Sequence, residues 1–307
     1  MKSLKQKSKK DLNQISRAWN LIFHILFAAL SFLCLVPVYF VTIISFTDET
    51  YIDTYGYQLF PGSFSLNAYE YLWGQINSVI RALSVSFIVT VTGTIAGILL
   101  TTAMGYVLSI HSFKGKNFLT WYIFIPMIFN GGLVSTYYIN SNLLHLKDSL
   151  LALILPLLVS SYNIIICRTF FKTTIPEALL ESAKIDGASQ FRIYFRIALP
   201  ISKPLLATIG LFLSFRYWND WYSSLLYIDN QRLYSLQALL QKITKNIEFL
   251  TQNASQMGLS QAELIASLPK ESFRMAMAVI IILPIACVYP FFQKYFITGL
   301  TIGAVKG

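Results

Sequence analysis

Apolar stretches without charged side chains alternate with short polar segments along this chain. The charge-free windows lie between Arg17 and Asp48, Arg81 and Lys114, Lys116 and Lys147, Asp148 and Arg168, and Arg274 and Lys294. Each window can hold the roughly 20 residues that a helix needs to cross the hydrocarbon core of a membrane. A sixth apolar stretch, from about Ala198 to Tyr227, is less uniform because it contains Lys203, Arg216 and Asp220. The pattern predicts six membrane spans.

The expected secondary structure is helical. Only helices and closed barrels satisfy all backbone hydrogen bonds in lipid, and no segment alternates apolar and polar residues as a barrel strand does. We therefore predict an all-α polytopic membrane protein with spans at about 19–46, 79–110, 118–139, 150–171, 198–227 and 275–298. This transmembrane domain, 19–300, would follow a basic N-terminus, 1–18, and precede a short tail, 301–307.

The basic residues predict the orientation of the spans. Lysine and arginine cluster in the N-terminus, in the 114–116 turn and in the polar segment between Arg168 and Arg196. The segment 47–78 contains no lysine or arginine. Since loops rich in these residues stay in the cytoplasm, both termini and the 174–200 segment should be cytoplasmic.

Composition supports a membrane protein. Of 307 residues, 55% are hydrophobic and 12% are charged, against about a quarter charged in soluble domains. The net charge of +10 follows from topology and contact with a lipid surface, so nucleic acid need not be invoked. The three cysteines are scattered and have no metal-binding spacing, which favours simple packing thiols.

The polar segment 174–200 has signals for two short helices. Thr174 and Glu177 have the spacing of a capping box, and Gly187 is suited to end the helix that would begin there. Ser189 can cap a second helix that runs into Pro200. Ala183 lies one turn before Gly187, so one helix face should be small enough for close approach by another surface. An ordinary solvated amphipathic loop is the alternative interpretation.

The same segment resembles the Glu-Ala-Ala loop of bacterial ABC-importer permeases. The matching landmarks are Glu181-Ser182-Ala183, then Gly187 after three residues, then Ile197 and Leu199-Pro200. The one departure is Ser182, where the family usually has alanine. In that family the loop forms a coupling helix between helices 4 and 5 that docks into a cytoplasmic ATPase. The resemblance implies ATPase-coupling roles for Glu181, Ser182, Ala183, Asp186 and Gly187.

Polar residues inside the third and fourth spans are candidates for a substrate path. Asn130 stands before paired glycines in mid-span and indicates a break in the helix, which is tolerated only where it faces protein or water. With Tyr137 and Tyr138, this region resembles the carbohydrate-uptake branch of the permeases. Asn130 could contact sugar or serve as a hinge, and both interpretations stay open. Asn163, in the fourth span, should face the bundle interior.

The fifth span is chemically the richest. Arg216 and Asp220 are four residues apart, with Asn219 between them, so an intrahelical ion pair on a wet surface is the simplest prediction. Trp218 and Trp221 flank Asn219 and Asp220 in the sequence. The four residues resemble the Trp-Asn-Asp-Trp stretch of carbohydrate permeases. Asn219 and Asp220 could bind sugar hydroxyls while the indoles contact C–H faces. A structural pair with an interfacial aromatic belt is the alternative.

The two segments flanking the sixth span also carry predictions. Leu236, Leu240 and Ile243 recur at helical spacing, which predicts an amphipathic helix in the outer segment, followed by an extended loop up to Pro269. The glycine-rich tail resembles the ending of maltose-type permeases, which inserts between two ATPase subunits. This resemblance implies an ATPase contact through Gly303, Lys306 and Gly307; a frayed terminus is the alternative.

No catalytic motif accompanies these features. The sequence contains no Gly-x-x-x-x-Gly-Lys-Ser/Thr loop, and its three histidines lie in separate segments without metal-ligand spacing. We predict no catalytic residue, metal or cofactor in this chain, and no enzyme activity; ATP and Mg would be bound by a partner.

The resemblance covers nearly the whole chain. It implies a sugar or oligosaccharide permease in a bacterial cell membrane that works by alternating access. The expected partners are a second, homologous permease, two ATPase subunits and an extracellular lipoprotein that binds the substrate. The alternatives are an ABC permease for another solute, an ion-coupled secondary transporter, for which Asp220 is the candidate acid, and a membrane scaffold or sensor.

Overall fold

The computed structural model describes residues 16–253 and 269–304. Across these ranges the regular structure is helical, with one isolated bridge between Thr47 and Phe64. The α-helices are α1 (Arg17–Ser45), α2 (Glu49–Tyr55), α3 (Asn67–Gly74), α4 (Ile76–Ser109), α5 (Lys116–Ile128), α6 (Gly132–Tyr138), α7 (Leu150–Ile154), α8 (Ser161–Thr174), α9 (Glu177–Ile185), α10 (Gln190–Ile193), α11 (Leu199–Ile201), α12 (Lys203–Trp218), α13 (Tyr222–Tyr227), α14 (Leu236–Gln252) and α16 (Glu271–Ala304). Short 3-10 or π turns are η1 (Ile139–Leu143), η2 (Leu155–Leu157), η3 (Tyr194–Ala198) and η4 (Gln231–Leu233).

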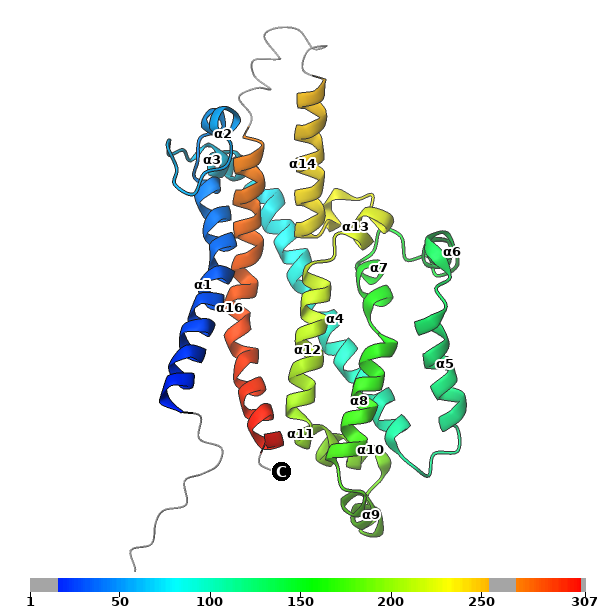
Figure 1. Cartoon of the computed structure of the whole chain (residues 1–307). Helices are drawn as coiled ribbons and strands as arrows, with labels where there is room; N and C mark the ends of the chain where they lie inside the picture. Colours follow the sequence, from blue (N-terminus) through cyan, green and yellow to red (C-terminus); the bar gives the residue numbers. More distant parts are fainter. Residues whose placement is uncertain (1–15, 254–268, 305–307) are drawn as a thin grey trace, which may run out of the picture.

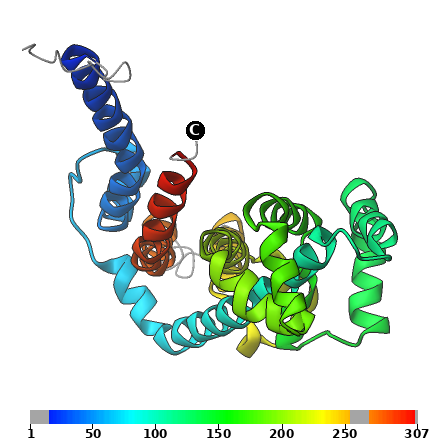
Figure 2. The ribbon, with the colours of Figure 1, turned by 90° about the horizontal axis from the view of Figure 1, so that it is seen from below.

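The long helices run between two ends of the molecule. Helix α9 lies at one end, and α2, α3 and α14 lie at the other (Figure 1). The first residues of α1 and the last of α16 are toward the α9 end. Seen along the helices, α1 and α16 form one side of an arc, α4, α8 and α12 form its middle, and α5 and α6 form the far side (Figure 2).

The all-helical membrane prediction is confirmed in its coarser form. In the described part of the chain, α1, α4 and residues 271–290 of α16 are each long and apolar enough to cross a membrane. Two bent pairs pass the same test, α7 and η2 with α8, bent by 52°, and α10 to α11 with α12, bent by 84°. The chain therefore has three to five candidate spans by this measure, and the count of six stays a prediction.

Two predicted spans are interrupted where we expected continuous helices. Helix η2 ends at Leu157 and α8 begins at Ser161, so the fourth span is broken. The fifth is bent at Ser202 and broken again after Trp218. The break predicted near Asn130 is present, because α5 ends at Ile128 and α6 begins at Gly132.

Helix α4 is the central element of the bundle and packs against both α8 and α12. Its glycines allow this approach: an added Cβ would lie 2.4 Å from the Tyr217 ring at Gly93, and 2.4 Å from the Cβ of Cys167 at Gly105. The glycines of the second span therefore serve helix packing.

Candidate functional site

Helix α9 projects beyond the other labelled helices at its end of the molecule (Figure 1). It begins at Glu177, directly after Pro176, which adopts an extended conformation and gives no side-chain cap. The predicted capping box is wrong because Thr174 is still the last residue of α8. The physical cause is Pro176, which forces the preceding Ile175 out of the helical region and so separates α8 from α9.

The C-terminus of α9 has the geometry that the sequence predicted. Gly187 has φ +78°, a conformation that only residues without a Cβ adopt at no steric cost. Its N–H donates to the carbonyl of Lys184 at 3.0 Å, and the N–H of Ala188 donates to the carbonyl of Ala183 at 3.0 Å. These two bonds form a Schellman motif. Ser189 then caps α10 by accepting from the Arg192 N–H at 3.3 Å, as predicted.

The exposed face of α9 differs from the predicted small-residue face. Ala183 is buried in the chain's own main core, against which α9 rests. Glu181 and Ser182 are exposed, and Ile185 is 85% exposed. Because a helix that ends at Ile185 must use one face to hold itself to the bundle, the small residue Ala183 serves that face. The surface left for another molecule is formed by Glu181, Ser182, Ile185 and the turn at Asp186 and Gly187.

A polar cavity of about 190 Å³ separates part of α9 from the ends of α4 and α8. Its lining includes Lys172, Glu177, Glu181 and Lys184. Across it, His111 Nδ1 lies 3.5 Å from Glu177 Oε1, with both side chains more than half exposed. The first turn of α9 therefore gains little stability from this solvent-accessible pair, and the buried Ala183 is its main anchor to the bundle.

The candidate residues in the third and fourth spans differ in their contacts and burial. The side-chain oxygen of Asn130 accepts from the Gly132 N–H at 2.9 Å, so it stabilises the turn between α5 and α6. This contact favours the hinge interpretation, and a sugar contact stays untested. Asn163 is buried, as predicted for an interior position. Tyr138 is 61% exposed.

Tyr137 belongs to a cluster that the sequence did not predict. Its ring stacks on Tyr227 with centroids 5.9 Å apart, and Asn140 donates to the Tyr227 hydroxyl at 3.0 Å. This cluster joins α6 and η1 to α13. Asn140 was visible in the sequence as a polar residue at the end of the third span, but its partner lies 87 residues away.

The predicted Arg216–Asp220 ion pair is not formed. Helix α12 ends at Trp218, and Asp220 lies beyond it. The Asp220 carboxylate accepts from the N–H of Ser223, in the first turn of α13, at 3.2 Å. A four-residue spacing brings side chains together only while the helix continues. Arg216 and Asn219 are exposed, and Trp221 is half-buried.

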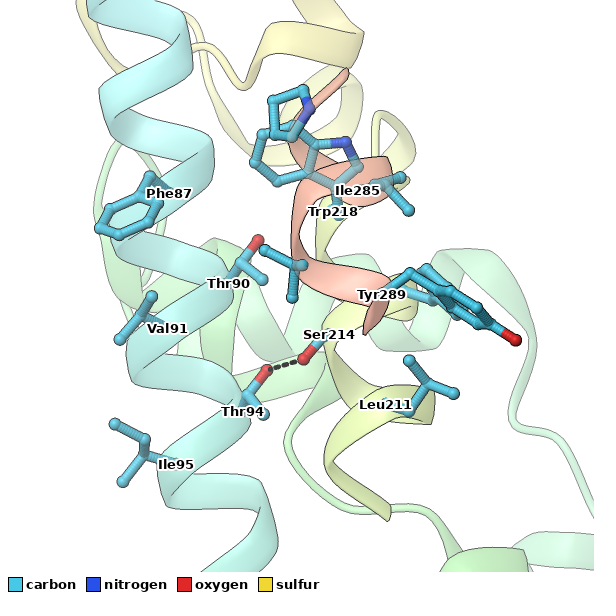
Figure 3. A pocket seen from close by; sticks show the side chains of 13 residues that line it. Phe87, Thr90, Val91, Thr94, Ile95, Leu211, Ser214, Trp218, Ile285 and Tyr289 are labelled. Carbon is cyan, nitrogen blue, oxygen red and sulfur yellow. Dashed lines mark hydrogen bonds between the residues drawn. The ribbon is translucent and has the colours of Figure 1, made fainter. Parts of the chain in front are cut away.

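Trp218 lines an apolar groove between α4, α12 and α16 (Figure 3). The groove has a volume of about 360 Å³. The Trp218 indole N–H donates to the Ile281 carbonyl at 3.2 Å, and Thr94 and Ser214 share a hydrogen bond of 3.4 Å. Aliphatic and aromatic side chains form most of the remaining wall, including Phe87, Leu211, Ile285 and Tyr289. Such a wall suits apolar groups better than the hydroxyls of a sugar.

The last turn of α16 extends into the predicted C-terminal tail. Gly303 belongs to the last turn of α16, which continues past the predicted span end at 298. Lys306 and Gly307 lie outside the described residues. In residues 16–253 and 269–304, no group of histidine, cysteine, aspartate or glutamate is arranged to hold a metal ion.

Comparisons with known proteins indicate the class of protein to which this chain belongs. No protein-family model matches the chain. The chain is 37% identical over 273 residues to protein LplC of Bacillus subtilis (strain 168), covering 89% of this chain and 90% of that protein. It is 34% identical over 292 residues to the polygalacturonan/rhamnogalacturonan transport system permease protein YtcP of the same organism, covering 95% and 99%.

A solved structure shares the fold. A chain of a bacterial ABC transporter involved in the import of the acidic polysaccharide alginate superposes with a TM-score of 0.74 at 23% identity, over 92% of this chain and 99% of that chain.

These findings define a transport subunit of the membrane rather than an enzyme. The chain belongs to the ABC-importer permeases, in the branch that takes up sugars and oligosaccharides. Permeases of this family work with a permease partner, ATPases and a binding protein.

Proposed function

We propose that this chain is one half of a transmembrane pathway for a sugar or oligosaccharide, with six spans and with α9 in the cytoplasm. The observation that carries the proposal is the exposed helix α9, which is closed by a Schellman turn at Gly187 and stands beyond the helix bundle. The predicted cytoplasmic location of the basic N-terminus supports this orientation, because the start of α1 lies at the same end as α9.

Helix α9 would dock into a cytoplasmic ATPase subunit and transmit its motion to the spans. Glu181, Ser182, Asp186 and Gly187 would form the contact, and Ala183 would fix α9 to the bundle from behind. Because Ile185 is the most exposed apolar side chain of α9, it would enter an apolar part of the ATPase surface. ATP and Mg would be held by that subunit, and Lys306 and Gly307 of the tail would add a second contact.

The other partners would be a second, homologous permease and an extracellular lipoprotein that delivers the substrate. The α14 end of the molecule would face that binding protein, since α14 extends outward there (Figure 1). Carbohydrate is the favoured substrate because relatives are named for polygalacturonan, rhamnogalacturonan and arabinooligosaccharides. One relative at 25% identity is named for sn-glycerol-3-phosphate, so another solute is the second candidate.

Two substitutions at Gly187 test the coupling role. Gly187→Val places a β-branched residue at φ +78°, where it is strained, whereas Gly187→Asn keeps a residue that tolerates this conformation. In the reconstituted importer, we expect Gly187→Val to abolish substrate-stimulated ATP hydrolysis and Gly187→Asn to retain most of it. Full stimulation in Gly187→Val would disprove docking through this turn.

Uptake measurements distinguish the transport classes. Transport by the assembled importer should stop when ATP is depleted and should not be restored by a proton gradient. Uptake that persists on a gradient alone would favour an ion-coupled transporter instead.

A further inference from the structure

Three basic residues lie on two packed helices, α5 and α8, toward the α9 end of the bundle. Lys116 is the first residue of α5, ahead of its apolar stretch, and Arg168 and Lys172 are one turn apart on α8, which contacts α5. Burial lowers the pKa of Lys116, and the positive charges of Arg168 and Lys172 lower it further. The packing of α5 on α8 thus brings Lys116 near two cations that are themselves one helical turn apart.

Within residues 16–253 and 269–304, these three cations form no ion pair. The ion pairs of the described residues involve other basic groups: His111, Lys147 and Arg274. Lys172 shares the polar cavity with Glu177 and Glu181, but neither carboxylate comes within 4.0 Å of it. Lys116 and Arg168 are half-buried, and Lys172 is exposed. Like charges held together in a partly buried position are unfavourable unless an anion from outside compensates them.

The surroundings of the cluster indicate where that anion comes from. Next to Lys116, α5 presents exposed aromatic side chains, Phe118, Trp121 and Tyr122, with exposed fractions of 77%, 62% and 65%. Aromatic rings beside basic residues are typical of the level at which lipid headgroups meet hydrocarbon. A soluble anion would gain nothing from this apolar surface, whereas an anion attached to acyl chains would contact both features.

We propose that Lys116, Arg168 and Lys172 form a binding site for the headgroup of an anionic phospholipid whose acyl chains lie along the aromatic surface of α5. The phosphate group accepts hydrogen bonds from the two lysines and from the guanidinium of Arg168. The site lies beside the base of α9, since Lys172 also lines the cavity under that helix. This inference is separate from the proposed transport function, because it holds whichever solute is carried.

Lipid binding to the full chain tests the site. The chain is placed in nanodiscs of phosphatidylcholine with a tenth of phosphatidylglycerol, and the lipids that stay bound after extraction are counted by native mass spectrometry. A cation near an anionic surface contributes about 1 kcal/mol, so removing one should lower retention about fivefold. We expect about a 25-fold loss in Lys116→Gln/Arg168→Gln, and retention close to the parent value in Lys116→Arg.

The matched control is Arg196→Gln, since Arg196 is exposed in η3 at the same end of the bundle but outside the cluster. Its lipid retention should equal that of the parent chain. If lipid retention fell equally in Arg196→Gln and in the double variant, anionic lipid would be held by general charge attraction, and the proposed site would be overturned. Saturable binding of inorganic phosphate in pure phosphatidylcholine, lost in the double variant, would show a soluble-anion site and would also overturn the proposal.

Discussion

Gly105 leaves no room for a side chain between α4 and α8. A Cβ there would lie 2.4 Å from the Cβ of Cys167 and 3.0 Å from the backbone nitrogen of Arg168. Neither atom is the end of a flexible side chain, so the two helices must separate. We predict that Gly105→Ala lowers Tm, at a cost of about 1–3 kcal/mol from overpacking. Thermal unfolding of the detergent-purified chain measures the effect.

Gly74 provides the control for this substitution. It ends α3, and a Cβ added there would meet nothing within 4 Å. Gly74→Ala should leave Tm unchanged or raise it slightly, because alanine loses less backbone entropy than glycine. A similar fall in both variants would show that crowding at Gly105 is not the cause.

At the residue scale, the sequence shows where small residues lie but not which residues pack against them. In the second span, Gly93 and Gly105 allow close contacts with neighbouring helices. That Tyr217 fills the space beside Gly93 depends on the crossing of α4 and α12. The inward position of Ala183 likewise depends on how α9 lies against the bundle, which no local pattern specifies.

The first turn of α16 donates hydrogen bonds to a carboxylate from another helix. Glu49 of α2 is buried and accepts from the N–H groups of Glu271 and Ser272 at 2.8 and 3.1 Å, and from the Ser272 hydroxyl at 2.7 Å. Removing the acceptor leaves three donors without this partner, two of them on the buried Ser272. We predict that Glu49→Ala lowers the free energy of unfolding by about 1–3 kcal/mol, which thermal unfolding would detect.

The exposed Glu70 is the matched residue for this comparison. Glu70→Ala should change stability by less than about 0.5 kcal/mol, as surface substitutions usually do. Hydrogen exchange at the first turn of α16 should rise in Glu49→Ala and stay constant in Glu70→Ala. Unchanged exchange in both would show that Glu49 does not stabilise the start of α16.

A second connection between elements depends on pH. Asp148 accepts from the N–H groups of Asp229 and Asn230 at 2.7 and 2.8 Å, joining the segment before α7 to the segment after α13. The hydrogen bond from Asn230, and then that from Asp229, lower the pKa of Asp148. Because the folded pKa is below the ordinary value of about 4, this stabilisation is complete above that value and is lost as pH falls through the folded pKa.

Amide exchange at Asp229 and Asn230 reports this connection. At pH 7 we expect Asp148→Ala to speed exchange at both amides, and we expect the difference from the parent chain to shrink below about pH 4. Lys147 pairs with Asp229 at 2.8 Å, so Lys147→Gln serves as a control that alters the charge while keeping the two backbone hydrogen bonds. Equal protection at pH 7 in the parent chain and in Asp148→Ala would contradict the prediction.

At the element scale, hydropathy located the apolar segments but not their breaks. The windows around α1, α4 and α16 each became one helix, since nothing inside them opposes helix formation except proline. The interruption at 158–160 and the bend at Ser202 were missed because a hydropathy window does not register a short break inside an apolar segment. Pro200 and Pro204 flank the bend, and proline cannot donate the backbone hydrogen bond of a continuing helix. The Arg216–Asp220 prediction failed because it assumed that α12 continues past Trp218.

At the scale of the whole molecule, the two ends carry different chemistry. The α9 end holds the basic cluster Lys116, Arg168 and Lys172, whereas the α14 end holds Glu49, Glu271 and the Arg274–Glu248 pair. This asymmetry is what the distribution of lysine and arginine in a membrane protein predicts. We therefore predict that the two ends face opposite compartments.

Cysteine labelling tests this orientation directly. Ser182 is exposed on α9, and Lys245 is exposed on α14, at the other end of the molecule (Figure 1). With a thiol reagent that cannot cross membranes, Lys245→Cys should be labelled in protoplasts, whose cell membrane is intact and accessible from outside. Ser182→Cys should be labelled only in inverted vesicles, and the parent chain gives the background from its own cysteines. Because six spans place α9 and α14 on opposite sides, labelling of both positions from the same side would exclude the six-span arrangement and, with it, the access of a cytoplasmic ATPase to α9.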